Sequence, residues 1–184
     1  MDFIQNIDFS ILNWIYNNVR NDFLDVIMPL ITMIGDHGLF FIVLSIFLIC
    51  SKKYRKIGIT MAIALSLGFI FGNLILKPLV ERIRPYDITP NINMLVHALS
   101  DYSFPSGHTL SSFAVATVIL CFNKKIGIFA IIIATLIGFS RLYLYVHFPT
   151  DVLCGAILGI MFGNLSYWFI MKRYNLLSQN NKRL

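Results

Sequence analysis

Charged residues are scarce in this chain. Asp, Glu, Lys and Arg make up 13% of its 184 residues, whereas 57% are hydrophobic. Ordinary soluble domains carry about 25% charged residues, so this chain has too little polar surface to cover a soluble globule of its size. The composition therefore excludes an ordinary soluble domain and favours a single integral membrane domain over residues 1–184.

Cysteine and clustered carboxylates are also rare. The three cysteines, Cys50, Cys121 and Cys154, lie in or at the ends of apolar runs, without the spacing of a zinc site or an evident disulfide partner. We interpret them as buried packing residues. A Mg2+ site needs several oxygen ligands, and the chain has no cluster of carboxylates to supply them. The sequence therefore predicts no metal ion and no cofactor.

The net charge of +6 does not indicate a nucleic-acid partner, because the basic residues cluster beside apolar segments and form no stripe with interleaved aromatics. A secretory signal is not indicated either. Asp2 and Asp8 occupy positions where such a signal carries positive charge, and no cleavage site follows an apolar core. We therefore expect the N-terminus to be retained.

Hydrophobic runs indicate the membrane crossings, since a spanning helix needs about 20 apolar residues. Six runs qualify, three of them short, at residues 22–34, 38–51, 56–77, 107–122, 126–146 and 150–171. Residues 8–19 mix large apolar side chains with Asn and Asp, which is typical of a helix at the membrane surface. The sequence predicts an all-α integral membrane bundle of six crossings, the first two short, preceded by an N-terminal interfacial helix.

Basic residues predict the orientation, because Lys and Arg favour short cytoplasmic loops. Six crossings with both termini in the cytoplasm place 11 of the 15 basic residues there: Arg20, Lys52, Lys53, Arg55, Lys56, Lys124, Lys125, Lys172, Arg173, Lys182 and Arg183. The other four, Lys77, Arg82, Arg84 and Arg141, lie on the opposite face. We expect a multi-pass protein of the cell membrane whose functional site opens to the extracytoplasmic side.

Three short blocks hold most of the charge on that opposite face. They read Lys77-x6-Arg84-Pro85, Pro105-Ser106-Gly107-His108 and Ser140-Arg141-x5-His147-x3-Asp151. Each has an ordinary explanation when taken alone: a Lys at the membrane surface, the start of a helix, and a structural His at a membrane edge. Together they supply three cations for an anionic ester, two imidazoles and a carboxylate that orients one of them.

Local sequence places these groups at helix ends. A Pro follows Lys77 and marks a helix boundary there, while Ser106 or its neighbour is placed as the N-cap of an apolar helix whose free amides favour an anion. Arg141 lies in the last turns of another apolar helix, where a charge needs an anionic partner. Asp151, in the first turn of the next helix, is placed to bind one imidazole nitrogen of His147 and leave the other free to attack phosphorus.

The three blocks match, without substitution and in order, the signature of the type 2 phosphatidic acid phosphatase superfamily, which this chain resembles. The resemblance implies a metal-independent phosphatase that works through a phosphohistidine. It assigns His147 as the nucleophile, Asp151 as its orienting partner and His108 as the general acid. It also implies that the phosphate is held by Lys77, Arg84, Ser106, Gly107 and Arg141.

The blocks bind phosphate and do not identify the lipid. This short, insertion-free form resembles the bacterial members that recycle the carrier lipid of cell-wall biogenesis, so we expect undecaprenyl diphosphate as the substrate. Phosphatidylglycerophosphate, phosphatidic acid and a lipid A phosphate remain alternatives, as does transfer of the phosphoryl group to an acceptor other than water.

Outside the enzymes, the alternative is a lipid-phosphate transporter. It is disfavoured because the charges gather at one face instead of near the bilayer midplane. Apart from the lipid phosphate and the surrounding membrane lipids, the sequence indicates no partner, and it does not determine the oligomeric state.

Other polar residues are expected near the site. Asp36 and His37 form a polar turn on the same side, which either joins two helices or touches the substrate headgroup. His97, Glu81 and Arg82 are expected at its mouth.

Overall fold

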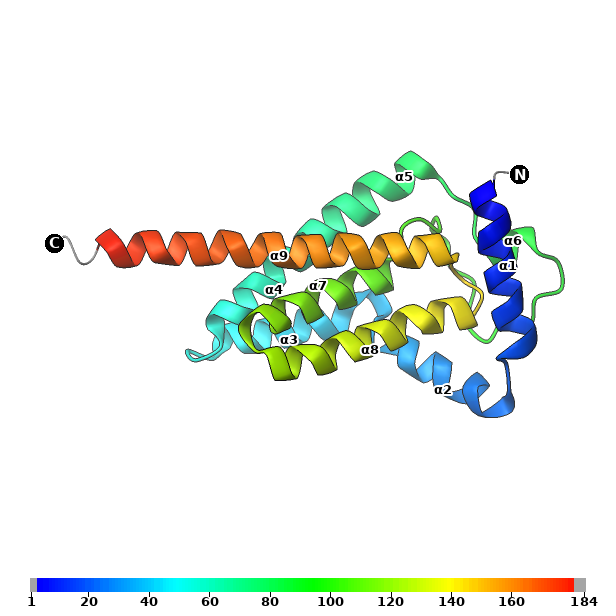
Figure 1. The fold of residues 1–184 in the computed structure, drawn as a ribbon, viewed down its shortest axis with the longest axis horizontal. Helices are drawn as coiled ribbons and strands as arrows, with labels where there is room; N and C mark the ends of the chain where they lie inside the picture. The colour runs from blue at the N-terminus through cyan, green and yellow to red at the C-terminus, as the bar shows by residue number, and fades with distance from the viewer. Residues whose placement is uncertain (1–2, 181–184) are drawn as a thin grey trace.

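A computed structural model describes residues 3–180, with side chains over residues 3–174, and every regular element in that range is helical (Figure 1). The elements are α1 Phe3–Asn18, α2 Asp22–Met33, η1 Asp36–Gly38, α3 Leu39–Cys50, α4 Arg55–Gly68, η2 Phe69–Leu76, α5 Lys77–Val80, α6 Pro85–Ile88, α7 Gly107–Phe122, α8 Lys124–Tyr143 and α9 Pro149–Asn180. The prediction of an all-α membrane fold is confirmed.

The number of crossings differs from the prediction. Four segments are long and apolar enough to span a membrane, Asp22–Cys50, Arg55–Ile88, Lys124–Tyr143 and Pro149–Tyr174, and α7 is a shorter apolar helix. The two short crossings predicted at 22–34 and 38–51 are therefore one. The reason is length: α2 and α3 have 12 residues each, about 18 Å at 1.5 Å per residue, against a hydrocarbon core about 30 Å thick. Figure 1 shows α3 continuing in the direction of α2.

A kink separates α2 from α3. His37 and Gly38 both have left-handed backbone conformations, with φ of 50° and 65°. Glycine adopts this conformation without strain, whereas His37 does not. The chain therefore turns at η1 without reversing, and the turn places Asp36 against α7.

One crossing fewer changes the position of the termini. Figure 1 shows α1 at one end of the long axis and the C-terminal part of α9 at the other. The prediction that both termini lie on one face is therefore wrong. Arg20, which was predicted on the cytoplasmic face, instead lies beside α1 at the end that holds the three blocks. There it donates to the Asn93 carbonyl at 3.0 Å.

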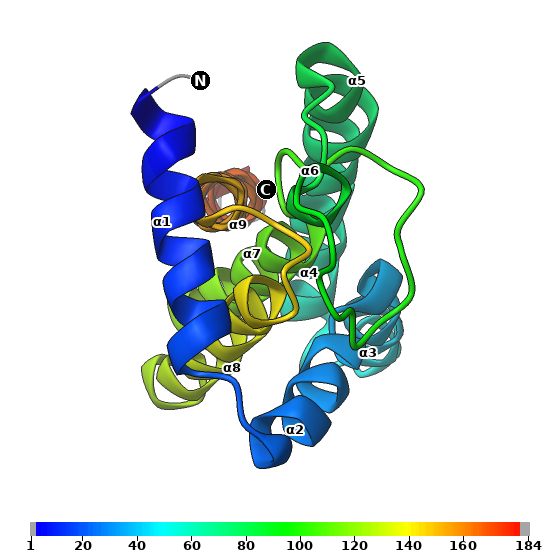
Figure 2. The same cartoon turned by 90° about the vertical axis from the view of Figure 1, so that its right-hand side faces the viewer.

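The helix α1 lies across the end of the bundle (Figure 2). Its inner side is buried through Asp8, Leu12 and Ile15, while an apolar outer side is exposed, including Phe3, Ile4, Ile7, Ile11 and Trp14. This amphipathic arrangement is typical of a helix in the membrane surface. The interfacial helix begins at Phe3, five residues before the predicted start.

The helix α7 occupies the middle of the bundle because glycines allow its neighbours to approach. A Cβ added to Gly155 of α9 would lie 2.8 Å from a carbonyl oxygen at the N-terminal end of α7. A Cβ on Gly159 or Gly163 would lie 2.5 or 2.8 Å from carbonyl oxygens farther along α7. Small residues at four-residue spacing permit such close contact between helices in membranes. The first turn of α9 is thereby held beside the first turn of α7.

The crossing that leads to Lys77 is not a regular α-helix. Its segment η2 is a π-type helix, and α5 begins at Lys77 directly after it. Such widened turns change the direction of the side chains that follow and are frequent at functional sites. Here the Lys77 side chain is buried against the bundle.

Candidate active site

The three blocks meet at one end of the bundle, although about 75 residues of sequence separate the first from the last. Each charged group lies at a helix end: Lys77 starts α5, Arg84 precedes α6, His108 lies in the first turn of α7, Arg141 ends α8, His147 lies between α8 and α9, and Asp151 lies in the first turn of α9. Lys77, Arg84, Arg141, His147 and Asp151 are all buried. Burying so many charges is costly unless each has a partner, so their contacts indicate what the site binds.

His147 lies between an acidic and a basic partner. Its Nδ1 is 3.6 Å from Asp151 Oδ2 and 3.4 Å from Ser103 Oγ, while its Nε2 is 3.3 Å from Arg84 Nη1. Burial, supported by the nearby cations Arg84 and Arg141, lowers the pKa of His147 to about 3. The imidazole is therefore neutral at neutral pH, and with the proton on Nδ1 the lone pair lies on Nε2.

The Asp151 carboxylate is held by several donors. Its Oδ2 accepts from the Ser103 hydroxyl at 2.5 Å and the Phe148 amide at 2.9 Å. Its Oδ1 accepts from Arg82 Nη1 at 2.6 Å. The carboxylate is thereby oriented with Oδ2 facing His147.

Arg84 and Lys77 converge on a residue outside the blocks, Asp101. Arg84 donates to Asp101 Oδ1 at 2.6 Å and to its carbonyl at 2.8 Å, and Lys77 Nζ bonds to Asp101 Oδ2. Partial burial opposes ionisation of this carboxyl, but the two cations lower the pKa of Asp101 to about 2. Two cations predicted to bind phosphate thus hold a half-exposed carboxylate of the chain itself.

Arg141 has fewer partners than its burial requires. Its Nη1 donates to Thr32 Oγ1 at 2.6 Å. Its Nε and Nη2 are buried, and neither has a hydrogen-bond partner within the described residues. Leaving a buried donor unsatisfied costs about 1–3 kcal/mol, more when it is charged. The guanidinium therefore presents two free donors in the geometry that fits two oxygens of one anion.

His108 is paired with the kink between α2 and α3. Its Nε2 lies 2.8 Å from Asp36 Oδ1. A Cβ on Gly35 would lie 2.7 Å from the His108 ring, so the absence of a side chain there lets the kink reach it. The charges of Arg141 and Lys77 also act on this imidazole. The sequence left two roles open for the polar turn, and the structure adds a third: Asp36 is a partner of His108.

Ser106 has its bonds within the fold. Its side chain caps α7 by accepting from the Thr109 amide, as predicted, and its own amide donates to the Asp151 carbonyl at 3.2 Å. The amides of Gly107 and His108 in the same turn make no hydrogen bond to the part of the chain that the structure describes. Free amides at a helix start are donors for an anion, so this turn offers backbone groups and not the Ser106 hydroxyl.

Several residues were missed or misplaced by sequence reasoning. Asp101 and Ser103 contact the predicted site residues but were missed, because a single Asp or Ser in an irregular segment carries no spacing signal. Arg82 was expected at the mouth of the site and instead binds Asp151. His97 is exposed.

Cys50 is exposed and the other two cysteines are half-buried, so their interpretation as buried residues is wrong for Cys50. Among the described residues, no group of three or more His, Cys, Asp or Glu side chains is placed to hold a metal ion.

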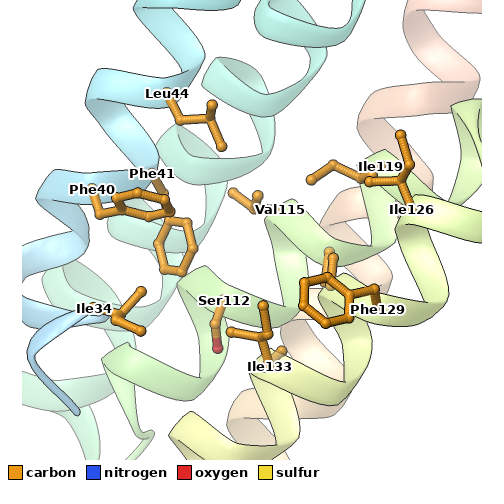
Figure 3. A pocket seen from close by; sticks show the side chains of 13 residues that line it. Ile34, Phe40, Phe41, Leu44, Ser112, Val115, Ile119, Ile126, Phe129 and Ile133 are labelled. Atoms are coloured by element: carbon orange, nitrogen blue, oxygen red, sulfur yellow. The ribbon is translucent and has the colours of Figure 1, made fainter. Parts of the chain in front are cut away.

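An apolar groove lies among α3, α7 and α8. It lies between α3 and α8 with α7 as its floor, and has a volume of about 260 Å³ (Figure 3). Its walls include Phe41, Leu44, Val115 and Ile133. Ser112, one turn after His108 on α7, also lines the groove, so part of its lining lies close to the helix start that carries His108.

Comparison with known proteins gives consistent matches. Residues 54–175 match the model of the PAP2 superfamily. The bacitracin transport permease protein BcrC of Bacillus licheniformis is 32% identical over 143 residues, covering 76% of this chain and 70% of that protein. An undecaprenyl-diphosphatase of Sulfolobus acidocaldarius is 34% identical over 159 residues, covering 86% and 74%.

Among solved structures, the transmembrane PAP2-type phosphatidylglycerolphosphate phosphatase of Bacillus subtilis superposes with a TM-score of 0.75 at 32% identity, covering 94% of this chain and 88% of that one. The match of the family model to most of the chain, together with the three blocks assembled at one end of the bundle, shows that this protein belongs to the PAP2 superfamily of membrane lipid phosphatases.

Proposed function

We propose that this phosphatase hydrolyses undecaprenyl diphosphate to undecaprenyl phosphate and inorganic phosphate through a phosphohistidine. The single observation that carries the phosphate site is Arg141, whose buried Nε and Nη2 have no partner in the described residues. A phosphate oxygen pair satisfies both donors at once. The free amides of Gly107 and His108 add backbone donors for the same anion.

The nucleophile in this proposal is Nε2 of His147. It attacks the terminal phosphorus while the bond between that phosphorus and the bridging oxygen breaks. His108 gives its proton to the bridging oxygen, so that undecaprenyl phosphate leaves. The new P–N bond is the phosphohistidine, and Asp151 stabilises the positive charge on the imidazole.

Water completes the cycle. His108, now neutral, takes a proton from a water molecule as its oxygen attacks the phosphorus, and the P–N bond breaks. Inorganic phosphate leaves and His147 returns to its neutral form. Charge on the phosphoryl oxygens is compensated throughout by Lys77, Arg84 and Arg141, which act as fixed cations.

Substrate binding requires a rearrangement at Asp101. In the free protein its carboxylate holds Lys77 and Arg84. A substrate phosphate carries more negative charge and offers more acceptor oxygens than one carboxylate, so the two cations exchange Asp101 for the phosphate. The half-exposed side chain of Asp101 has room to move toward solvent.

The lipid chain lies, in this proposal, in the apolar groove of Figure 3. Its lining comes within one helical turn of His108 on α7 and is almost wholly apolar. With the diphosphate at the helix ends, the groove takes only the first part of the isoprenyl chain, and the rest of the chain lies in the lipid bilayer.

Other lipid phosphates fit the same phosphate site. Phosphatidylglycerophosphate, phosphatidic acid and a lipid A phosphate stay alternatives, and undecaprenyl diphosphate is preferred because of the short form of the chain and the likeness to an undecaprenyl-diphosphatase. A relative bears a transport name, but the charged groups here gather at one end of the bundle. A transporter is expected to place its polar site near the midplane, so this arrangement does not support a through-path.

Basic residues support an extracytoplasmic site. In the described chain, the far end of the bundle carries Lys52, Lys53, Arg55, Lys56, Lys124, Lys125, Lys172 and Arg173, while five basic residues lie at the site end. By the positive-inside bias, the far end is cytoplasmic. The N-terminal helix α1 then lies on the outer surface, in contrast to the cytoplasmic N-terminus predicted from six crossings.

A substrate panel tests this function. Purified protein is given undecaprenyl diphosphate, phosphatidylglycerophosphate, phosphatidic acid and a lipid A phosphate, and released phosphate is measured with and without EDTA. We expect the highest kcat/KM for undecaprenyl diphosphate, unchanged by EDTA because the fixed cations take the place of a metal. A higher kcat/KM for another lipid would contradict undecaprenyl diphosphate as the preferred substrate and identify that lipid instead. Activity lost in EDTA and restored by Mg2+ would contradict the metal-free mechanism.

A further inference from the structure

Arg82 occupies one of the six unspecified positions of the first block, and it binds Asp151 directly. Its Nη1 donates to Asp151 Oδ1 at 2.6 Å and to Thr150 Oγ1 at 2.7 Å, and its Nη2 donates to Asp8 Oδ2 at 2.6 Å. The guanidinium also stacks over the Phe148 ring, 4.0 Å from its centroid. One side chain therefore connects the proposed orienting carboxylate to the N-terminal helix.

Asp8 is the other fixed point of this connection. It is only 1% exposed, although it lies on the surface helix α1. Its carboxylate accepts from the Thr150 amide at 3.0 Å and from the Thr150 hydroxyl. The buried carboxylates of Asp8 and Asp151 thus share one guanidinium, and each would be an uncompensated buried charge without it.

The connection determines how Asp151 faces His147. Arg82 occupies Oδ1, while Ser103 and the Phe148 amide bind Oδ2, which leaves Oδ2 directed at His147 Nδ1. Rotation of the carboxylate would break the hydrogen bonds to Oδ2. The Arg82 contact holds the second oxygen as well and so restrains the carboxylate plane further.

Other contacts tie α1 to the turn that carries His147. Phe9 packs edge-on against Phe148 with ring centroids 5.1 Å apart. Tyr145, two residues before His147, donates to Asn13 Oδ1 at 2.6 Å. The apolar outer side of α1 remains exposed for the membrane surface.

We propose that Arg82 and Asp8 are positioning residues for the phosphatase reaction, through which the surface helix α1 holds Asp151 and His147 in the geometry for attack on phosphorus. The inference rests on the proposed role of His147 as nucleophile. It assigns α1 a catalytic positioning task in addition to lying on the membrane. Neither Arg82 nor Asp8 contacts the phosphate-binding cations, so their loss is expected to affect turnover and not substrate binding.

The test compares Arg82→Gln, Arg82→Lys and Asp8→Asn in detergent-purified protein. Loss of partners that orient a catalytic side chain typically costs about 10- to 100-fold in activity, so we expect kcat of Arg82→Gln to fall by about that factor with KM nearly unchanged. Arg82→Lys keeps the charge but not the two-pronged geometry, and is expected to recover part of kcat. Arg20→Gln is the matched control, because Arg20 lies at the same end and pairs with Asp25 and not with Asp151.

A double mutant separates positioning from general destabilisation. If Asp8 acts through Arg82, the kcat of Asp8→Asn with Arg82→Gln is close to that of Arg82→Gln alone, since both changes break one connection. Multiplied losses, an unchanged kcat in Arg82→Gln, or a loss confined to KM would each overturn the proposal. If Arg82→Gln does not fold, the kcat of Arg82→Lys and Asp8→Asn decides by the same criteria.

His147→Ala distinguishes a failure of the proposed function from a failure of the positioning role. An active His147→Ala protein contradicts the nucleophile itself. An inactive His147→Ala protein beside a fully active Arg82→Gln protein contradicts only the positioning role.

Discussion

At the scale of single residues, the site combines groups of two kinds. His147, Arg84 and Asp101 form a closed set of contacts in the free protein, whereas Arg141 keeps two buried donors free of protein partners among the described residues. The charges of the first group are already compensated within the protein, whereas the charge of Arg141 is not. Arg141 is therefore the residue whose free donors we propose to be satisfied by the phosphate of the substrate.

Replacement of the nucleophile is the first test at this scale. We expect His147→Ala to reduce phosphate release by at least about 1,000-fold, as removal of a catalytic nucleophile does in other hydrolases. The rate is measured on folded protein, verified by size-exclusion chromatography and melting temperature. His97→Ala is the control, because His97 is exposed. Release at the unmutated rate by folded His147→Ala would remove the assignment.

Asp101→Asn tests whether the carboxylate competes with substrate. Exposed ion pairs contribute up to about 1 kcal/mol, so we expect KM to fall by about two- to fivefold. The pKa of Asp101 is lowered to about 2, so the carboxylate is ionised above that pH and becomes protonated only as the pH falls through it. The ratio of the two KM values should therefore be the same at pH 5 and pH 8. An unchanged KM with a reduced kcat would show instead that Asp101 holds the cations in their working position.

At the scale of secondary-structure elements, the site depends on how helix ends are brought together. The glycines of α9 let it approach the backbone of α7, and Gly35 lets the kink between α2 and α3 reach His108. The π-type segment η2 leads into Lys77. Each device positions the start of one functional block, so changes far from the phosphate are expected to disturb the site.

Gly159→Leu tests the contact between α7 and α9. Even a Cβ at Gly159 would lie 2.5 Å from the Leu110 carbonyl oxygen, so a larger side chain must push the helices apart. Overpacking typically costs about 1–3 kcal/mol, and a backbone neighbour cannot move aside as a side chain can. We expect a clearly lower melting temperature in detergent and reduced activity. Ile160→Ala is the control, because Ile160 is exposed; an equal loss in both variants would contradict close packing as the cause.

At the scale of the whole molecule, the described residues form a bundle of four long apolar segments and the shorter apolar helix α7, and α1 lies across the site end (Figure 2). By the positive-inside bias, the basic residues at the far end favour the orientation that we propose, with that end in the cytoplasm. The same asymmetry explains why the few remaining basic residues are available for an anionic substrate.

Cysteine labelling in intact cells tests this orientation. A cysteine is placed at His97 or at Lys124 in a background without the three native cysteines, and a membrane-impermeant thiol reagent is added. We expect labelling at 97, on the site side, and protection at 124 until the membrane is opened. The reverse pattern would invert the orientation and place the phosphatase site in the cytoplasm.

Sequence alone was sufficient for the class of fold, the three blocks and the phosphatase chemistry that the blocks imply. These depend on composition and on residues close together in the chain, such as His147 just before α9 and Asp151 in its first turn. The sequence also predicted Ser106 as a helix cap, because capping is a local property.

The tertiary structure decided the rest. Two short apolar runs became one crossing because the left-handed turn at His37 and Gly38 bends the chain without reversing it. The contacts of Asp101 with Lys77 and Arg84, of Asp36 with His108, and of Arg82 with Asp8 and Asp151 join residues 17 to 74 positions apart. Spacing in the sequence carries no record of such contacts, because they arise only when helix ends pack together and leave buried charges that must find partners.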